Sequence, residues 1–89
     1  MSKILVVDDE AKVCKILERF LEAKGHEVVT ARNGIEALEE LKNDLVDLII
    51  SDILMPEMDG FEFCRKCKTN TKLRMIPFVF YTASYISKK

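Results

Sequence analysis

Carboxylates that follow two apolar runs are the side chains of this chain best suited to chemistry. One run, residues 4–7, is followed by Asp8 and Asp9, and a second, residues 46–50, is followed by Asp52. Short apolar runs are typical of strands buried on both faces of a parallel sheet. A charge at the carboxyl end of such a strand lies where open α/β sheets form ligand sites. The pattern predicts one acidic pocket, centred on Asp52.

Three carboxylates brought close together repel one another, so at neutral pH they bind a cation or take up protons. The side chains near them offer oxygen ligands only, which favours Mg²⁺ or Mn²⁺ over zinc. An Asp beside such an ion can act as a nucleophile and form an aspartyl phosphate. Thr82, at the end of another apolar run, would offer a hydroxyl to a phosphoryl oxygen. Each acid alone could equally be a solvated loop carboxylate, and the convergence of three such residues is what favours a site.

The elements that position these side chains alternate between strand and helix. We expect strands over residues 3–9, 26–31, 46–53 and 76–83, and helices over 11–24, from Asn33 onward, and over 60–68. Such alternation predicts βαβ units and a parallel sheet with right-handed crossovers. The acidic strand ends meet only if the first and third strands are neighbours. The expected fold is therefore a doubly wound α/β sheet with strand order 2-1-3-4.

The helical spacing of apolar residues predicts which helix faces are buried. The predicted faces are Val13, Ile16, Leu17, Phe20 and Leu21 in the first helix, Ile35, Leu38 and Leu41 in the second, and Phe61, Cys64 and Cys67 in the third. Gly25 is expected to end the first helix. Asn33 is expected to cap the second, with Glu36 as its partner in a capping box.

The composition limits the classes of protein to consider. The chain has 89 residues, 48% hydrophobic and 33% charged, with a formal net charge of -1, which predicts one small globular domain, residues 1–89. Acidic and basic residues are interspersed, which argues against nucleic-acid binding. No apolar run approaches the roughly 20 residues that span a bilayer, and residues 1–3 lead into a strand rather than a signal peptide. We expect a cytoplasmic protein without a membrane segment.

Two of the three cysteines, Cys64 and Cys67, form a C-x-x-C pattern. Redox pairs of this spacing lie at a helix N-terminus, where the dipole lowers the thiol pKa. Here the pair falls more than one turn inside a predicted helix, and no second Cys or His pair completes four zinc ligands. We therefore expect structural, reduced cysteines.

Three stretches together resemble the receiver domain of two-component response regulators. They are residues 4–10 (Ile-Leu-Val-Val-Asp-Asp-Glu), residues 52–60 (Asp-x-x-x-Pro-x-Met-Asp-Gly) and residues 81–83 (Tyr-Thr-Ala). The resemblance runs from the first predicted strand to just past the fourth, and so covers nearly the whole chain. It implies the flavodoxin-like receiver fold. It also implies a signalling switch of a phosphorelay that catalyses only its own phosphorylation and dephosphorylation, rather than an enzyme with turnover.

The resemblance implies a role for each site residue. Asp52 would be the phosphoacceptor, and the donor would be a phosphohistidine on a sensor histidine kinase or phosphotransfer protein. Asp9 would bind Mg²⁺ directly and Asp8 through water or nearby, and Asp52 and the backbone carbonyl of Leu54 would be further metal ligands. Thr82 would be the switch hydroxyl that moves toward the phosphoryl group.

The chain departs from the family pattern near its C-terminal end. The family carries a lysine after a fifth strand, and Lys88 and Lys89 lie too close to Thr82 to take that role. We therefore expect a receiver domain without its fifth strand and last helices. The fourth strand would then have an open edge. Further chain would cover that edge, which is the interpretation we prefer, or another copy would pair with it in a homodimer or other self-association.

Two other functions fit parts of the pattern. A receiver-like interaction module that is never phosphorylated is supported by the missing lysine and opposed by the acids and Thr82. An aspartyl phosphatase on a related sheet generally has a second Asp two residues after its nucleophile, where this chain has Leu54. A phosphoacceptor receiver domain is the leading hypothesis.

Overall fold

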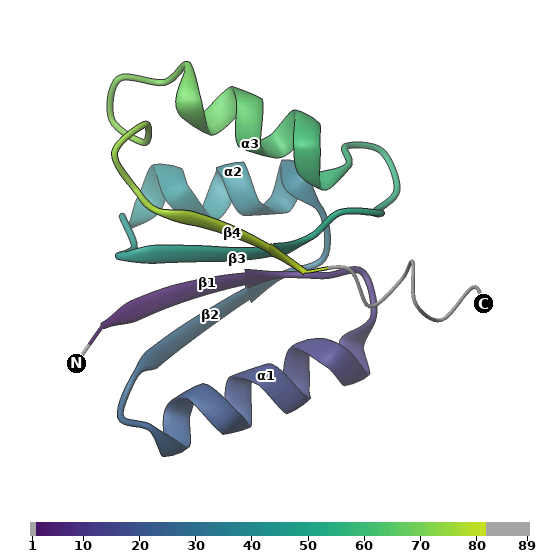
Figure 1. Cartoon of the computed structure of the whole chain (residues 1–89), viewed down its shortest axis with the longest axis vertical. Coiled ribbons are helices and arrows are strands. Elements are labelled where there is room, and N and C mark those ends of the chain that lie inside the picture. Colours follow the sequence, from purple (N-terminus) through teal and green to yellow (C-terminus); the bar gives the residue numbers. More distant parts are fainter. Residues whose placement is uncertain (1, 82–89) are drawn as a thin grey trace.

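The computed structural model describes residues 2–81, which fold as four strands and three helices. In chain order these are β1 (Lys3–Val7), α1 (Ala11–Ala23), β2 (Glu27–Ala31), α2 (Gly34–Asn43), β3 (Leu48–Asp52), α3 (Gly60–Lys68) and β4 (Phe78–Tyr81). Figure 1 shows three layers, with α1 on one side of the sheet and α2 and α3 on the other. Within the described part of the chain, no helix is both long enough and apolar enough to cross a membrane.

The strands form a parallel sheet in the order β2-β1-β3-β4, as the sequence predicts. The chain turns one way from β1 to β2 and the other way to β3, so the carboxyl ends of β1 and β3 are neighbours. Val7 pairs with Ser51 at this edge. The strands begin or end one or two residues short of the predicted bounds, and residues 82 and 83 of the fourth predicted strand lie outside the described residues. In particular, β4 begins at Phe78 and not at residue 76, because Pro77 has no N–H for the ladder and contributes only its carbonyl, which accepts from the N–H of Ile49 at 3.0 Å.

Each face of the sheet has its own hydrophobic cluster, because successive side chains of a strand point to opposite faces. The cluster under α2 and α3 is the larger one. Its fully buried members include Leu5, Val7, Ile49, Ala37 and Phe63. The cluster under α1 consists of Ile4, Val6 and Cys14, with Leu17 and Leu21 packed against it.

The predicted core face of α1 is only half right. Leu17 and Leu21 pack on the sheet, but Ile16 is 66% exposed and Phe20 is 58% exposed. The apolar stripe of this helix is therefore wider than the strip of sheet that it contacts. Val79, on β4, is also exposed, at 48%.

The predicted core faces of α2 and α3 are right toward the end of each helix and wrong at its start. Leu41 and Cys67 are buried as predicted, and Leu38 is partly buried against the core. Ile35 and Phe61 are instead exposed, at 47% and 52%. The buried position in the first turn is a glycine in each helix, Gly34 against the side chains of Met58 and Phe63 and Gly60 against the backbone of Asp52 and Ile53, where the absence of a side chain permits a close approach.

The local signals for helix ends are confirmed. Gly25 has φ 95°, in the left-handed region that ends a helix. The Asn33 side chain accepts from the N–H of Glu36 at 2.8 Å, which caps α2. The Glu36 carboxylate accepts from the N–H of Arg32 at 3.0 Å, one residue before the cap, so the reciprocal half of the capping box is displaced by one position.

Candidate functional site

The carboxyl edge of the sheet brings the three predicted acids together. Asp8, Asp9 and Asp52 each offer a carboxylate oxygen, and these three atoms all lie within 4.8 Å of one another. Asp8 and Asp52 are buried, at 2% and 1% exposed, whereas Asp9 is exposed. The pairing of β1 with β3 explains this closeness, since the two strands end side by side. We call these three residues the acidic cluster.

Asp52 is the last residue of β3, and its carboxylate is fixed by the chain that follows. One carboxylate oxygen accepts from the N–H of Ile53 at 2.7 Å. The backbone carbonyl of Asp52 accepts from the hydroxyl of Ser51 at 2.9 Å. Buried hydrogen bonds of this kind orient a side chain because breaking them in the interior is costly. The carboxylate of Asp52 is therefore held in place within the cluster.

Gly60 folds the loop after Asp52 back onto the end of β3. Its N–H donates to the carbonyl of Ile53 at 2.7 Å. A Cβ at Gly60 would lie 2.3 Å from the Asp52 carbonyl oxygen and 3.0 Å from the Ile53 Cα. Only glycine permits this approach of two backbones, so Gly60 is part of the support of Asp52.

The loop between Asp52 and Gly60 contains a tight turn and a helix cap. Glu57 has φ 69°, and the N–H of Met58 donates to the carbonyl of Pro56 at 2.7 Å. The Asp59 side chain accepts from the N–H of Glu62 at 2.9 Å and caps α3. Leu54, the predicted source of a carbonyl ligand, lies at the start of this loop and is partly buried.

Asp8 is held by two donors, one on each carboxylate oxygen. Oδ1 accepts from the N–H of Glu10 at 2.8 Å. Oδ2 accepts from the phenol of Tyr81, which reaches it from β4. Burial, and then the hydrogen bond to Asp8, raise the pKa of the Tyr81 phenol, so this group stays protonated and donates.

Tyr81 belongs to this site, although the sequence did not identify it as a site residue. The predicted hydroxyl at this strand end was that of Thr82, which lies outside the described residues. Tyr81 was predicted only as part of an apolar strand and of the stretch that resembles the receiver family. Its hydroxyl, at the strand's carboxyl end, was the available signal, because a buried tyrosine usually finds a partner for its O–H.

The ligands offered by the acidic cluster fit a small, hard cation. All three are carboxylates, which Mg²⁺ prefers, and the exposure of Asp9 leaves access for the waters that Mg²⁺ retains. No other group of three or more His, Cys, Asp or Glu side chains within residues 2–81 could hold a metal ion.

The cysteines take no part in such a site as ligands, and all three are free. Cys14 lies beneath the cluster, and its thiol donates to the backbone carbonyl of Asp8 at 3.3 Å. Burial raises the pKa of the Cys67 thiol to about 11. A thiol with a raised pKa is unreactive at neutral pH, which agrees with the expected structural role of Cys67.

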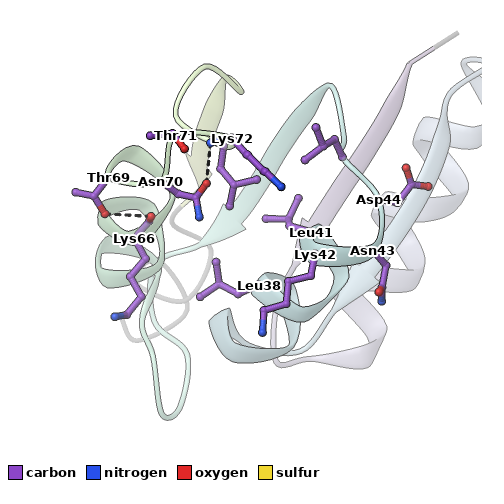
Figure 2. Close-up of a pocket in the computed structure, with 12 residues that line it drawn as sticks. Leu38, Leu41, Lys42, Asn43, Asp44, Lys66, Thr69, Asn70, Thr71 and Lys72 are labelled. Carbon is purple, nitrogen blue, oxygen red and sulfur yellow. Dashed lines mark hydrogen bonds between the residues drawn. The ribbon is translucent and has the colours of Figure 1, made fainter.

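A separate pocket of about 1000 Å³ lies between the ends of α2 and α3. Figure 2 shows that its labelled residues come from the last part of α2 and the residues just after it, and from the end of α3 and the segment that follows. Both helices start at the carboxyl edge of the sheet and run away from it, so this pocket and the acidic cluster are at opposite ends of the strands. Leucines and three lysines, Lys42, Lys66 and Lys72, are among the residues that line it. Lys42 is paired with Glu39 at 3.3 Å.

Comparison with known proteins identifies relatives over nearly all of the chain. A family model described as the response regulator receiver domain matches residues 4–88. The chain is 46% identical over 82 residues to the response regulator PleD of Caulobacter vibrioides. This match covers 92% of this chain and 18% of PleD. It is 42% identical over 82 residues to the alkaline phosphatase synthesis transcriptional regulatory protein PhoP of Bacillus subtilis, over 92% of this chain and 33% of PhoP. The chain thus spans a third or less of these relatives.

Solved structures share the fold. The signal receiver domain of a signal transduction histidine kinase from Syntrophus aciditrophicus superposes with a TM-score of 0.89 at 43% identity, over 92% of this chain and 62% of that one. The chemotaxis response regulator CheY4 of Vibrio cholerae superposes with a TM-score of 0.87 at 33% identity, over 99% and 76%. The strand order described above is the one expected of such domains. This chain therefore belongs to the response regulator receiver domain family.

Proposed function

We propose that this chain is a phosphoacceptor switch of a two-component phosphorelay, in which Asp52 receives a phosphoryl group from a phosphohistidine. The donor would be a sensor histidine kinase or a phosphotransfer protein in the cytoplasm. The observation that carries the proposal is the convergence of three carboxylate oxygens within 4.8 Å, one of them from the buried Asp52 at the end of an interior strand. Such a cluster is unfavourable without a cation, and phosphoryl transfer is a reaction for which protein carboxylates hold Mg²⁺.

Each residue of the site has a part in this reaction. Asp8, Asp9, Asp52 and the Leu54 carbonyl would hold Mg²⁺, which when bound neutralises charge on the carboxylates and on the phosphoryl group. A carboxylate oxygen of Asp52 forms the new P–O bond as the P–N bond to the donor histidine breaks. The N–H of Ile53 keeps the carboxylate oriented for this attack.

Thr82 would donate its hydroxyl to a phosphoryl oxygen and so transmit the change of charge to the end of β4. Because the product is a modified carboxylate and not a released molecule, the chain acts as a switch rather than as an enzyme with turnover. Binding of the phosphorylated form by a partner would read out the switch.

The test is phosphorylation of the chain by acetyl phosphate with Mg²⁺, and then borohydride reduction and peptide mass mapping of the acyl phosphate. We expect one phosphoryl group on Asp52 and none on the Asp52→Asn variant. Asp59→Asn is the matched control, since it removes an acid from the same loop while asparagine can still cap α3. It should be labelled like the original chain.

Two results would contradict the proposal. Equal labelling of the Asp52→Asn variant would move the phosphoacceptor to another residue. No labelling of the original chain, either by acetyl phosphate or by histidine kinases, would favour the phosphorylation-independent interaction module instead.

A further inference from the structure

The hydrogen bond between Tyr81 and Asp8 links the edge strand of the described sheet to the acidic cluster. The two residues are 73 positions apart in the sequence. They belong to the ends of β4 and β1, and β3 lies between these strands. The phenol therefore reaches across the end of β3, and Asp52 is the residue with which Tyr81 pairs. Within the bounds of β4, Phe78–Tyr81, Tyr81 is the only residue whose side chain can form a hydrogen bond.

Tyr81 is directed to this site by the alternation of β4. Phe78 and Phe80 turn to the opposite face, where their rings lie 5.2 Å from Phe63 and 5.1 Å from Phe61, centroid to centroid. Tyr81, which follows Phe80, points to the α1 face. The strand end is thus held by aromatic contacts on one face and by a hydrogen bond to a carboxylate on the other.

The acceptor of this bond is a carboxylate oxygen of Asp8, one of the three residues that could hold a cation. Asp8 is 2% exposed and has a donor on each oxygen, the N–H of Glu10 and the phenol of Tyr81. The N–H of Glu10 belongs to the chain just after Asp8 and leaves only if the backbone moves. The phenol belongs to a side chain with rotatable bonds and can leave without a change in β1. The phenol is therefore the donor that a cation would displace.

We propose that Tyr81 competes with a divalent cation for Asp8, so that binding of the ion releases the end of β4. This inference rests on the proposed function, because it takes the acidic cluster to be the cation site. Tyr81 is a positioning residue in this scheme, since it acts on the ion through Asp8. Thermodynamic linkage makes this effect reciprocal. The phenol lowers the affinity of the site for the cation by the same factor by which the cation lowers the affinity of the phenol for Asp8. Tyr81 directly precedes Thr82, so the release would act on the strand end that carries the proposed switch hydroxyl.

Tyr81→Phe is the variant that separates this proposal from a purely structural role. It keeps the ring and removes only the hydroxyl, which leaves Asp8 without one of its two donors. Because hydrogen bonds to charged acceptors are strong, we expect the variant to bind Mg²⁺ about three- to tenfold more tightly. Thr69→Val is the control, because it also removes a single hydroxyl, one that donates to the carbonyls of Arg65 and Lys66 at the end of α3, away from the acidic cluster. It should leave the affinity unchanged.

The measurement is a Mg²⁺ titration of the original chain and both variants, by calorimetry and by amide NMR at constant pH. In the original chain, the amides of Phe80 and Tyr81 should shift as the ion binds. In the Tyr81→Phe variant these shifts should shrink, while those of Asp9 and Asp52 persist.

The outcomes distinguish failure of the competition by Tyr81 from failure of the cation site itself. Unchanged or weaker Mg²⁺ binding by Tyr81→Phe would overturn the competition, and weaker binding would mean that the phenol orients Asp8 for the ion. No Mg²⁺ binding by the original chain, with the amides of residues 8, 9 and 52 unmoved, would overturn the cation site itself and with it the inference.

Discussion

The substitution Gly60→Ala tests how tightly the loop after Asp52 must close. The added Cβ would lie 2.3 Å from the backbone oxygen of Asp52, well inside the 3.0 Å that real Cβ atoms observe. Both contacting groups are backbone, so the helix start must move away from β3. Overpacking of this kind costs about 1–3 kcal/mol, and loss of the Gly60 N–H bond to Ile53 costs about 0.5–1.5 kcal/mol more. We expect the free energy of unfolding to fall by about 2–4 kcal/mol.

Chemical and thermal denaturation of this variant and a matched variant measure the effect. A small domain has about 5–15 kcal/mol of stability, so the loss is a large fraction of the total and should lower Tm by roughly 10–25 °C. Gly34→Ala is the comparison, because its Cβ would meet side-chain atoms and no backbone, the Met58 sulfur at 2.7 Å, the Met58 Cγ at 2.9 Å and the Phe63 Cβ at 3.1 Å. Since the Met58 side chain can shift, this substitution should cost less than Gly60→Ala, about 1 kcal/mol. Equal effects of the two substitutions, or a Gly60→Ala effect below about 0.5 kcal/mol, would refute the close-approach argument.

Two further predictions concern single side chains. Because burial raises the pKa of Cys67 from 9.0 to about 11, the folded protein favours the neutral thiol, and the stability this contributes is full below pH 9 and is lost as the pH rises toward 11. The unfolding free energy of Cys67→Ala should decline less steeply over that range, and an equally steep decline would argue against the assignment. Glu57→Gly should raise the unfolding free energy by up to about 1 kcal/mol, because glycine adopts φ 69° without strain. A lower midpoint in urea would contradict this.

The strand order and the acidic cluster could be predicted from the sequence because both depend on the carboxyl ends of apolar runs. A run followed by Asp8 and a run followed by Asp52 can share a site only if their strands are neighbours, as β1 and β3 are. Parallel pairing of these two strands is then sufficient to bring the carboxylates together. The roles assigned to Asp52, Leu54 and Thr82 stay predictions, which the experiments above address.

The helix faces could not be predicted in the same way, and Gly60 with Phe63 explains why. A hydrophobic pattern reports where large apolar side chains recur, and Phe61 and Cys64 satisfy it. The face that packs on the sheet instead includes a glycine, which adds nothing to such a pattern but permits close approach. Tyr81 was missed for a related reason, since its partner Asp8 lies across two strand pairings and no local spacing connects them.

The order in which the sheet pairs has a consequence for how the chain acquires its site. The pairing of β1 with β2 involves only the first 31 residues and closes a short βαβ unit. The acidic cluster requires in addition that β1 pair with β3, a longer loop closure whose entropic cost is larger. That second pairing also brings like charges together, so it is opposed by repulsion as well as by chain entropy. The site is therefore a property of the long-range pairing of β1 with β3 and not of the first βαβ unit, so a change that weakens this pairing removes the site even where β1 and β2 stay paired.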